Sequence, residues 1–325
     1  MIFIYNKSLD PFYNLAAEEY LVKNSNDEIF MLWRNDNTIV IGKNQNTLSE
    51  INYDYVKANN INVVRRMSGG GAVFHDIGNI NFTFILNSEG DFSNYEKFTR
   101  PIIAFLKSLG VNASLSGRND LVIGDKKISG NAQYMYKNRI LHHGTLLYSA
   151  ESNKLANSLK VSEDKVKSKG IKSVKSRVTN IADHLAVSFS AQEFIEKLAQ
   201  FMLKEGNISG EYDLENDRNQ IQKLREEKYA TWDWNFGYSP KYTFNKKMRF
   251  SSGGVEICMN VSSNGTIEDV KIFGDFFSKK DICELEEIII GHRHEYLEIK
   301  NLLSSVDIAD YISNITLEEF LETLF

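Results

Sequence analysis

The sequence predicts an α+β protein with a largely antiparallel sheet, divided into two domains. Strand-like and helix-like segments follow one another irregularly, without the steady strand–helix–strand repeat of a parallel α/β fold. The length of 325 residues suits two domains of roughly 100–200 residues each. From about residue 244 the pattern changes to a hairpin followed by helices. We therefore predict a domain of residues 1–244 and a smaller α+β domain of residues 245–325.

Local signals place the elements of the first domain. Asp10-Pro11 predicts a helix start, because aspartate caps a first turn and proline is tolerated at the first helical position. Two apolar runs, residues 29–33 and 38–42, are separated by polar residues and predict a hairpin. The remaining predicted elements are helices over residues 12–22 and 95–109, a helix ending near residue 60, and strands over residues 62–65, 80–86, 121–123 and 145–148.

The second domain begins with the clearest turn in the chain. Asn264-Gly265 separates two strand-like runs, residues 255–261 and 267–273, and this dipeptide is a strong hairpin signal. The polar stretch at 278–281 then predicts a capped helix start, and Gly291 predicts its end. Two further helical stretches close the chain.

Composition excludes several classes of protein. Charged residues make up 25% and hydrophobic residues 42%, which is typical of a folded globular chain. A net charge of −5 disfavours a broad nucleic-acid-binding surface. No apolar segment approaches the ~18 residues that span a bilayer, and two cysteines make no disulfide framework. We expect a cytoplasmic monomer that binds neither nucleic acid nor membrane.

The most unusual stretch runs from Arg65 to Asp76, with the sequence RRMSGGGAVFHD. Three consecutive glycines let a backbone approach a ligand closely and direct N–H groups at an anion. The preceding arginines can make bidentate contacts with phosphate or carboxylate. The spacing matches neither a Walker A loop nor a dinucleotide fingerprint. A sharp turn with two solvated arginines is the alternative.

Two further groups of residues contain polar and charged side chains that could bind a ligand. One combines Gly117-Arg118-Asn119-Asp120 with Lys126-Lys127-Ile128-Ser129-Gly130 and His142-His143-Gly144. The other is a basic stretch over residues 165–177, which is alternatively a solvated loop. Neighbouring lysines are usually solvated, and the histidine pair lacks the spacing of a zinc site. Together with the glycine stretch they indicate an anionic, phosphate-bearing ligand, but the residues alone do not name it.

Taken in order, these motifs resemble those of the lipoate–protein ligases. The likeness rests on RRxSGGGAVFHD, GRND, KISG and HHGTLL, and it extends to Leu32-Trp33-Arg34, to Gly78-Asn79 and to the segment from Trp232 to Gly237. It runs from near residue 5 to about residue 237 and continues more weakly beyond. The resemblance implies a catalytic domain with the fold of the biotin and lipoate ligases, which is like the class II synthetase core, and a small C-terminal accessory domain.

The resemblance also implies an activity. Such enzymes use ATP, with Mg²⁺ as its expected escort, to convert lipoate to lipoyl-AMP. They then transfer the lipoyl group to a lysine of an acceptor, either an E2 lipoyl domain or the glycine-cleavage H protein. An apolar acyl pocket gains ~0.8 kcal/mol per methylene, so we expect soft discrimination between lipoate and octanoate. No magnesium ligands are identified.

Site residues carry over at the matching positions. Lys127 is the expected catalytic residue, which bridges the lipoate carboxylate and the α-phosphate, and Arg66 is the expected phosphate arginine. A segment over residues 165–180 matches a loop that covers the adenylate. The full set expected to bind ATP or lipoate is Arg66, Ser68, Gly69, Gly70, Gly71, Ala72, Val73, Phe74, Asn79, Asn119, Asp120, Lys127 and His143, and the covering loop includes Lys169, Gly170, Lys172, Ser173 and Arg177.

Two other functions stay open at this point. An octanoyl or lipoyl transferase of related fold works without ATP, and its thioester-forming type needs a nucleophilic cysteine in the catalytic domain. The cysteines here, Cys258 and Cys283, both follow residue 244, which disfavours that type. The second is a non-catalytic binder of lipoylated carriers, disfavoured because Arg66, the glycines and Lys127 are all present.

Overall fold

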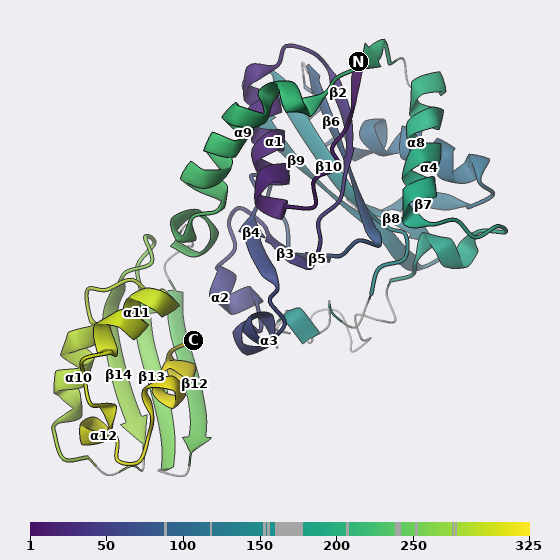
Figure 1. Cartoon of the computed structure of the whole chain (residues 1–325). Coiled ribbons are helices and arrows are strands. Elements are labelled where there is room, and N and C mark those ends of the chain that lie inside the picture. The colour runs from purple at the N-terminus through teal and green to yellow at the C-terminus, as the bar shows by residue number, and fades with distance from the viewer. Residues whose placement is uncertain are drawn as a thin grey trace. The chain divides into compact units, whose positions relative to one another are not determined.

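A computed structural model gives the fold of the chain (Figure 1). It describes residues 1–87, 90–117, 119–151, 154, 157–159, 178–205, 208–237, 242–250, 253–274, 276 and 278–325. The chain forms two compact units. Unit 1 comprises Met1–Lys43 and Asn60–Ala230, and unit 2 comprises Asn44–Asn59 and Thr231–Phe325. No sequence signal indicated that residues 44–59 group with the C-terminal part, and the predicted domain boundary at residue 244 stays a prediction.

Unit 1 is built on an eight-stranded sheet of order β11-β1-β2-β6-β10-β9-β8-β7. From β2 to β7 every neighbouring pair is antiparallel, whereas β1 pairs in parallel with both β2 and β11. The predicted α+β class with a largely antiparallel sheet is thus confirmed. The strands are β1 (Ile2–Tyr5), β2 (Ile29–Trp33), β6 (Asn79–Asn87), β7 (Ala113–Ser116), β8 (Asp120–Ile123), β9 (Lys126–Tyr136), β10 (Arg139–Leu147) and β11 (Gly210–Glu211).

Helices lie on both faces of this sheet (Figure 1). On one face α4 (Tyr95–Ser108) and α8 (Ala191–Glu205) bury Phe98, Phe105 and Phe194 against the sheet. On the other lies α1 (Pro11–Asn24), which begins as predicted: Asp10 accepts hydrogen bonds from the N–H groups of the first turn. Burial of α1 extends to Glu18 and Glu19, which is unusual for carboxylates.

A small three-stranded sheet completes unit 1, in the order β4-β3-β5. Its strands are β3 (Thr38–Ile41), β4 (Asn62–Arg65) and β5 (Val73–His75), and the glycine stretch connects β4 to β5. The predicted hairpin of residues 29–33 and 38–42 is wrong, because β2 pairs with β1 and β6 whereas β3 pairs with β4 and β5. Both strands are buried along their whole length, so both are central strands with two partners each.

Unit 2 is a three-stranded antiparallel sheet covered by short helices. The sheet contains β12 (Tyr242–Phe250), β13 (Gly253–Val261) and β14 (Ile267–Gly274), and the predicted Asn264-Gly265 turn joins the last two. Its helices are α10 (Ile282–Ile289), α11 (Tyr296–Leu303), α12 (Ile308–Tyr311) and α13 (Leu317–Leu324), with α2 (Thr47–Glu50) and α3 (Tyr53–Ala58) from the inserted segment.

The inserted segment belongs to unit 2 through specific contacts. The ring of Tyr53 packs on that of Phe325 with 5.6 Å between ring centroids, and the Thr47 hydroxyl donates to the Asn235 carbonyl over 2.6 Å. The segment from Trp232 to Gly237, which closes the motif series, is helical here, with Trp232 stacked on Phe236.

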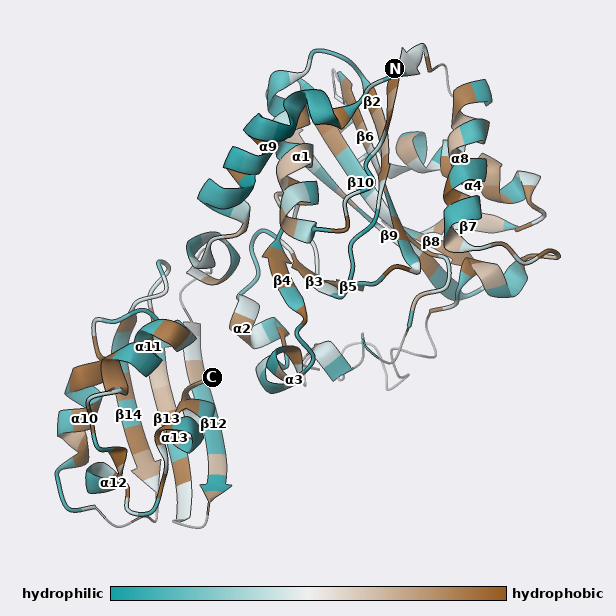
Figure 2. Ribbon diagram, in the orientation of Figure 1, coloured by the Kyte–Doolittle hydropathy of each residue, from teal (hydrophilic) through white to brown (hydrophobic). Residues whose placement is uncertain are grey.

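The remaining helices are short or lie at the surface. Helix α9 (Arg218–Leu224) is mainly hydrophilic in Figure 2 and buries Ile221. The others are η1 (Ile181–His184), η2 (Leu214–Asp217), η3 (Arg225–Tyr229) and η4 (Asp233–Gly237). No helix within the described ranges combines the length and apolar character needed to cross a membrane.

Candidate active site

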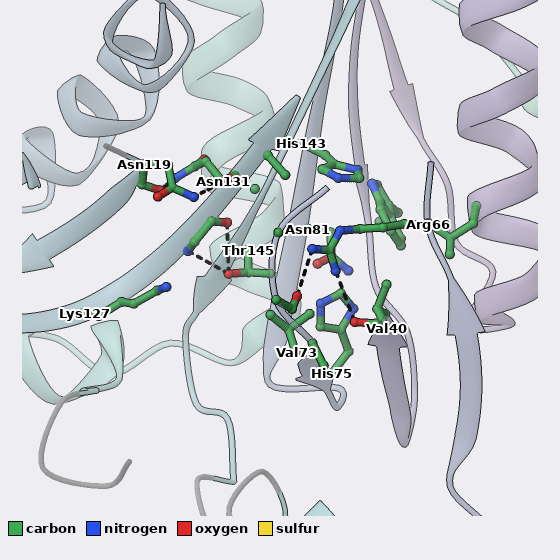
Figure 3. Close-up of a pocket in the computed structure, with 18 residues that line it drawn as sticks. Val40, Arg66, Val73, His75, Asn81, Asn119, Lys127, Asn131, His143 and Thr145 are labelled. Atoms are coloured by element: carbon green, nitrogen blue, oxygen red, sulfur yellow. Dashed lines mark hydrogen bonds between the residues drawn. The ribbon is translucent and has the colours of Figure 1, made fainter. Parts of the chain in front are cut away.

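A cavity of about 180 Å³ lies in unit 1 beside the glycine stretch. An engineered cavity of ~150 Å³ can hold a benzene ring, so this one has room for a ring-sized group. Figure 3 shows its two sides, with Lys127 and Asn119 on one and Arg66, Val40, Val73 and His75 on the other. The lining residues are Leu15, Trp33, Val40, Arg66, Gly70, Gly71, Ala72, Val73, His75, Asn81, Asn119, Lys127, Gly130, Asn131, Ala132, His143, Gly144 and Thr145.

Arg66 holds the glycine stretch in shape. Its Nη2 donates to the carbonyls of Gly69 at 2.7 Å and Gly71 at 2.9 Å. Its Nη1 donates to the Val40 carbonyl at 3.1 Å, and its Nε donates to Ser68 Oγ at 3.0 Å. Burial lowers the Arg66 pKa to about 10, which leaves the guanidinium charged at neutral pH. The guanidinium therefore fixes the loop, of which Gly70, Gly71 and Ala72 line the cavity.

The loop needs glycine at one position in particular. Gly70 has a φ of +96°, and a Cβ there would lie 3.0 Å from Nη2 of Arg66. A side chain at Gly70 would therefore strain the backbone and press on the guanidinium that holds the loop.

A buried hydrogen-bond chain links the loop to α1. Ser68 Oγ lies 2.6 Å from His143 Nε2, and His143 Nδ1 lies 3.0 Å from a carboxylate oxygen of Glu18. Thr83 donates to the same carboxylate at 2.6 Å and accepts from the Trp33 indole at 2.9 Å. The order Ser68–His143–Glu18 is that of a nucleophile, base and carboxylate. Ser68, however, is 1% exposed and does not line the cavity, so it is not placed to act as a nucleophile. The series of hydrogen bonds instead holds the glycine loop in position.

Lys127 lies in a more open setting at the start of β9. Its Nζ is 2.8 Å from Asp120 Oδ1, and both side chains are more than a third exposed. Nearby, the Asn119 amide donates to the Asn131 carbonyl at 2.6 Å, and the Asn131 amide donates back to the Asn119 carbonyl at 3.0 Å. These bonds hold the turn before β8 against β9.

Described residues before and after the basic stretch bond to residues of this site. The N–H of Glu151 donates to Asp76 over 2.7 Å, and the N–H of Thr179 donates to the Lys127 carbonyl over 3.0 Å. Val178 forms a parallel bridge with Lys127. The predicted loop residues Lys169, Gly170, Lys172, Ser173 and Arg177 lie outside the described residues.

The predicted site residues are only partly gathered at the cavity. It is lined by Arg66, Gly70, Gly71, Ala72, Val73, Asn119, Lys127 and His143. Ser68, Gly69 and Asp120 are bonded to lining residues. The side chain of Phe74 is buried, because β5 directs Val73 and His75 to the cavity instead. Asn79 is buried and donates to Asn81, which does line it.

Several residues that line the cavity were not among the site residues predicted from the sequence. They come from α1, β2, β3, β5 and β6, and they are Leu15, Trp33, Val40, His75 and Asn81. His75 had a usable signal, since period-two alternation from Val73 places both on one face. No described group of three or more His, Cys, Asp or Glu is arranged to hold a metal ion.

Comparison with known proteins agrees with this geometry. Residues 10–203 match the model of the lipoyl protein ligase A/B catalytic domain, and residues 239–324 match that of the bacterial lipoate protein ligase C-terminus. The chain is 45% identical to lipoate-protein ligase LplJ of Bacillus subtilis over 332 aligned residues, covering 100% of both. The chain belongs to the lipoate–protein ligase family. It is therefore an ATP-dependent ligase that activates lipoate as lipoyl-AMP and attaches it to protein.

Solved structures of relatives show the same fold. The P. falciparum LipL1 complex with lipoate is 28% identical, covers 99% of this chain and 97% of its own, and has a TM-score of 0.60. A lipoate-protein ligase A structure with bound ATP is 27% identical, covers 73% of this chain and 98% of its own, and has a TM-score of 0.62. These matches confirm the resemblance inferred from the motifs.

Proposed function

We propose that the cavity of unit 1 is where lipoate and ATP combine, with Lys127 as the catalytic residue. The observation that carries this is the placement of the Lys127 ammonium on one side of the cavity and of Val40 and Val73 on the other. An acid with an apolar tail fits this arrangement. Its carboxylate can pair with the Lys127 ammonium, and its tail can be buried against the apolar side chains.

The first reaction step requires the site to bring two anions together, the carboxylate of lipoate and the phosphates of ATP. A carboxylate oxygen of lipoate attacks the α-phosphorus of ATP, the new O–P bond forms, and pyrophosphate leaves. Lys127 offsets the charge of both partners in this step. Gly70, Gly71 and Ala72 line the cavity, and in this proposal their N–H groups bind phosphate oxygens. Arg66 contributes by holding these N–H groups in place.

Magnesium accompanies the nucleotide in this proposal. Mg²⁺ retains several waters and takes one or two carboxylates together with the phosphates of the substrate. Asp120, the carboxylate bonded to Lys127, is the residue that would hold such an ion. Bound there, the ion would supply positive charge for the phosphates.

The second step transfers the acyl group. The amine of an acceptor lysine attacks the acyl carbon of lipoyl-AMP, an amide forms, and AMP leaves. Glu151 is bonded to Asp76 and Val178 pairs with Lys127, and we propose that the loop of residues 165–180 covers the adenylate and excludes water. The acceptor is an E2 lipoyl domain or an H protein, and the enzyme works as a cytoplasmic monomer.

The deciding experiment measures lipoate-dependent pyrophosphate release from ATP and magnesium without acceptor protein. Release with lipoate but not with biotin is expected. A folded chain that released none, yet moved octanoyl groups from a carrier protein without ATP, would assign the cavity to the transferase function instead. Adding a lipoyl domain then tests transfer through the mass gain of that domain.

A further inference from the structure

Two residues that line the cavity each have a buried polar atom without a partner. Among the described residues, neither His75 Nε2 nor Asn81 Nδ2 makes a hydrogen bond. His75 is 4% exposed and Asn81 is 2% exposed, and both line the cavity. An unpaired buried donor costs roughly 1–3 kcal/mol, so such groups call for a function.

A chain of amides fixes which nitrogen of His75 carries the proton. The Asn14 amide nitrogen donates to the carbonyls of Ser8 and Arg34, which can only accept. The atom of Asn35 that meets this nitrogen is therefore its oxygen, and its own nitrogen faces His75 Nδ1 at 3.1 Å. Nδ1 must accept this bond, so Nε2 carries the hydrogen and is a donor.

The ring also stays neutral. Burial lowers the pKa of His75 to about 3, and the neighbouring charges of Arg66 and His143 lower it as well. At neutral pH the cavity thus meets an uncharged N–H donor, which suits a weak, uncharged acceptor rather than a carboxylate.

The other polar groups on this side are already paired. The Trp33 indole donates to Thr83, and both nitrogens of His143 are bonded. Four bonds occupy the Arg66 guanidinium. Trp33 also packs edge-on against His75 with 6.4 Å between ring centroids, which holds the imidazole in place.

We propose that His75 Nε2–H and Asn81 Nδ2–H recognise the ring sulfur atoms of lipoate and make the enzyme prefer this acid to sulfur-free acids of similar shape. The inference rests on the proposed function, in which the carboxylate lies at Lys127 and the tail points away from it. Sulfur is a weak acceptor, but a hydrocarbon tail offers no acceptor and leaves both donors unpaired. A site built this way discriminates more strongly than apolar contact alone. Lipoate and octanoate have the same chain length and differ in the sulfur atoms, so this proposal replaces the expectation of soft discrimination between them and keeps it only for differences in tail length.

The test pairs a change in the enzyme with a change in the acid. Wild-type chain and His75→Leu are compared with lipoate and with cyclopentyl-pentanoate, in which two methylene groups replace the sulfur atoms. The readout is kcat/KM for pyrophosphate release. Wild type should prefer lipoate by about tenfold, and His75→Leu should reduce that preference to near unity.

Matched variants separate recognition from packing. Val73→Ala removes apolar contact from the same strand face, and it should weaken both acids alike and leave the preference intact. His75→Gln retains an N–H donor near the position of Nε2 and should restore most of the preference. If His75→Leu fails to fold, Asn81→Leu tests the second donor in the same way.

The outcomes distinguish failure of the sulfur recognition from failure of the proposed ligase function. A wild-type enzyme that uses both acids equally, or a preference unchanged by His75→Leu and Asn81→Leu, overturns the sulfur recognition while the ligase function stands. Equal use would mean that a buried water satisfies both donors whatever the acid. No pyrophosphate release with any acid would instead count against the proposed function.

Discussion

The two sides of the cavity use their cations in opposite ways. On one side Arg66 is 7% exposed and makes four hydrogen bonds to the protein. On the other, Lys127 is 39% exposed and makes one ion pair, with Asp120. Four of the five N–H donors of Arg66 bond to the protein, which makes this residue mainly structural, whereas the ammonium of Lys127 has donors left to bind substrate. The motifs place the two residues in similar roles, but their replacement should have different effects: loss of Lys127 should lower the reaction rate, and loss of Arg66 should lower the stability of the fold.

The largest effect is expected at Lys127. Lys127→Ala should reduce the rate of lipoate-dependent pyrophosphate release by about a thousandfold, because the lost contact is strongest where charge concentrates in the transition state. The melting temperature should stay within about 1–2 °C of wild type, since an exposed ion pair contributes little to stability. Pyrophosphate release and thermal melting of the same preparations provide the check.

Lys126 supplies the control for that prediction. It precedes Lys127 in β9 and is exposed, and it does not line the cavity. Lys126→Ala should retain nearly the full rate. Equal losses in the two variants would point to the general charge of this edge and remove Lys127 from its catalytic role.

Arg66 should show the reverse pattern in stability. Arg66→Ala leaves the carbonyls of Val40, Gly69 and Gly71 without their donor, and we expect a loss of about 3 kcal/mol in the free energy of unfolding. Activity should fall with it, because the glycine loop loses its support. Urea denaturation measures the first effect. An Arg66→Ala chain of wild-type stability that fails to bind ATP would instead make Arg66 a direct phosphate ligand.

Replacement of a residue on each side should also have different effects on how the stability of the protein depends on pH. The pKa of His75 is about 3 in the fold and near 6.5 when unfolded, so between these values the unfolded chain binds the extra proton. Its contribution to stability is present above pH 6.5 and is lost as the pH falls toward 3. His75→Gln, which does not titrate, should flatten this part of the stability curve by up to about 4 kcal/mol.

The control for the acid response is Lys127→Ala. This variant should follow the wild-type curve in the same pH window, because it leaves the buried histidine in place. If His75→Gln lost stability as steeply as wild type between pH 6.5 and 3, another buried group would dominate, and His142 is the first candidate, since burial also lowers its pKa to about 3.

The difference between the two sides explains what the sequence could predict. Lys127, His143 and the glycines were found because their chemistry is local and their order along the chain is distinctive. Leu15, Trp33 and Asn81 were missed because they reach the cavity from α1, β2 and β6, and only tertiary pairing brings those elements together. The failed hairpin has the same cause, since an apolar run predicts a strand but does not name its partners.

The smallest effect is expected at the partner of the catalytic lysine. Asp120→Asn removes the negative charge 2.8 Å from Lys127 but retains a polar side chain of the same size. If Asp120 mainly orients Lys127, the rate should fall by about fivefold at all magnesium concentrations, in line with the modest strength of an exposed pair. If it also meets the ATP-bound ion, the loss should be larger at low magnesium and shrink as magnesium rises. Titration of pyrophosphate release with magnesium in both chains separates these roles, and a rate unchanged at every concentration would leave Lys127 as the single working charge on its side of the cavity.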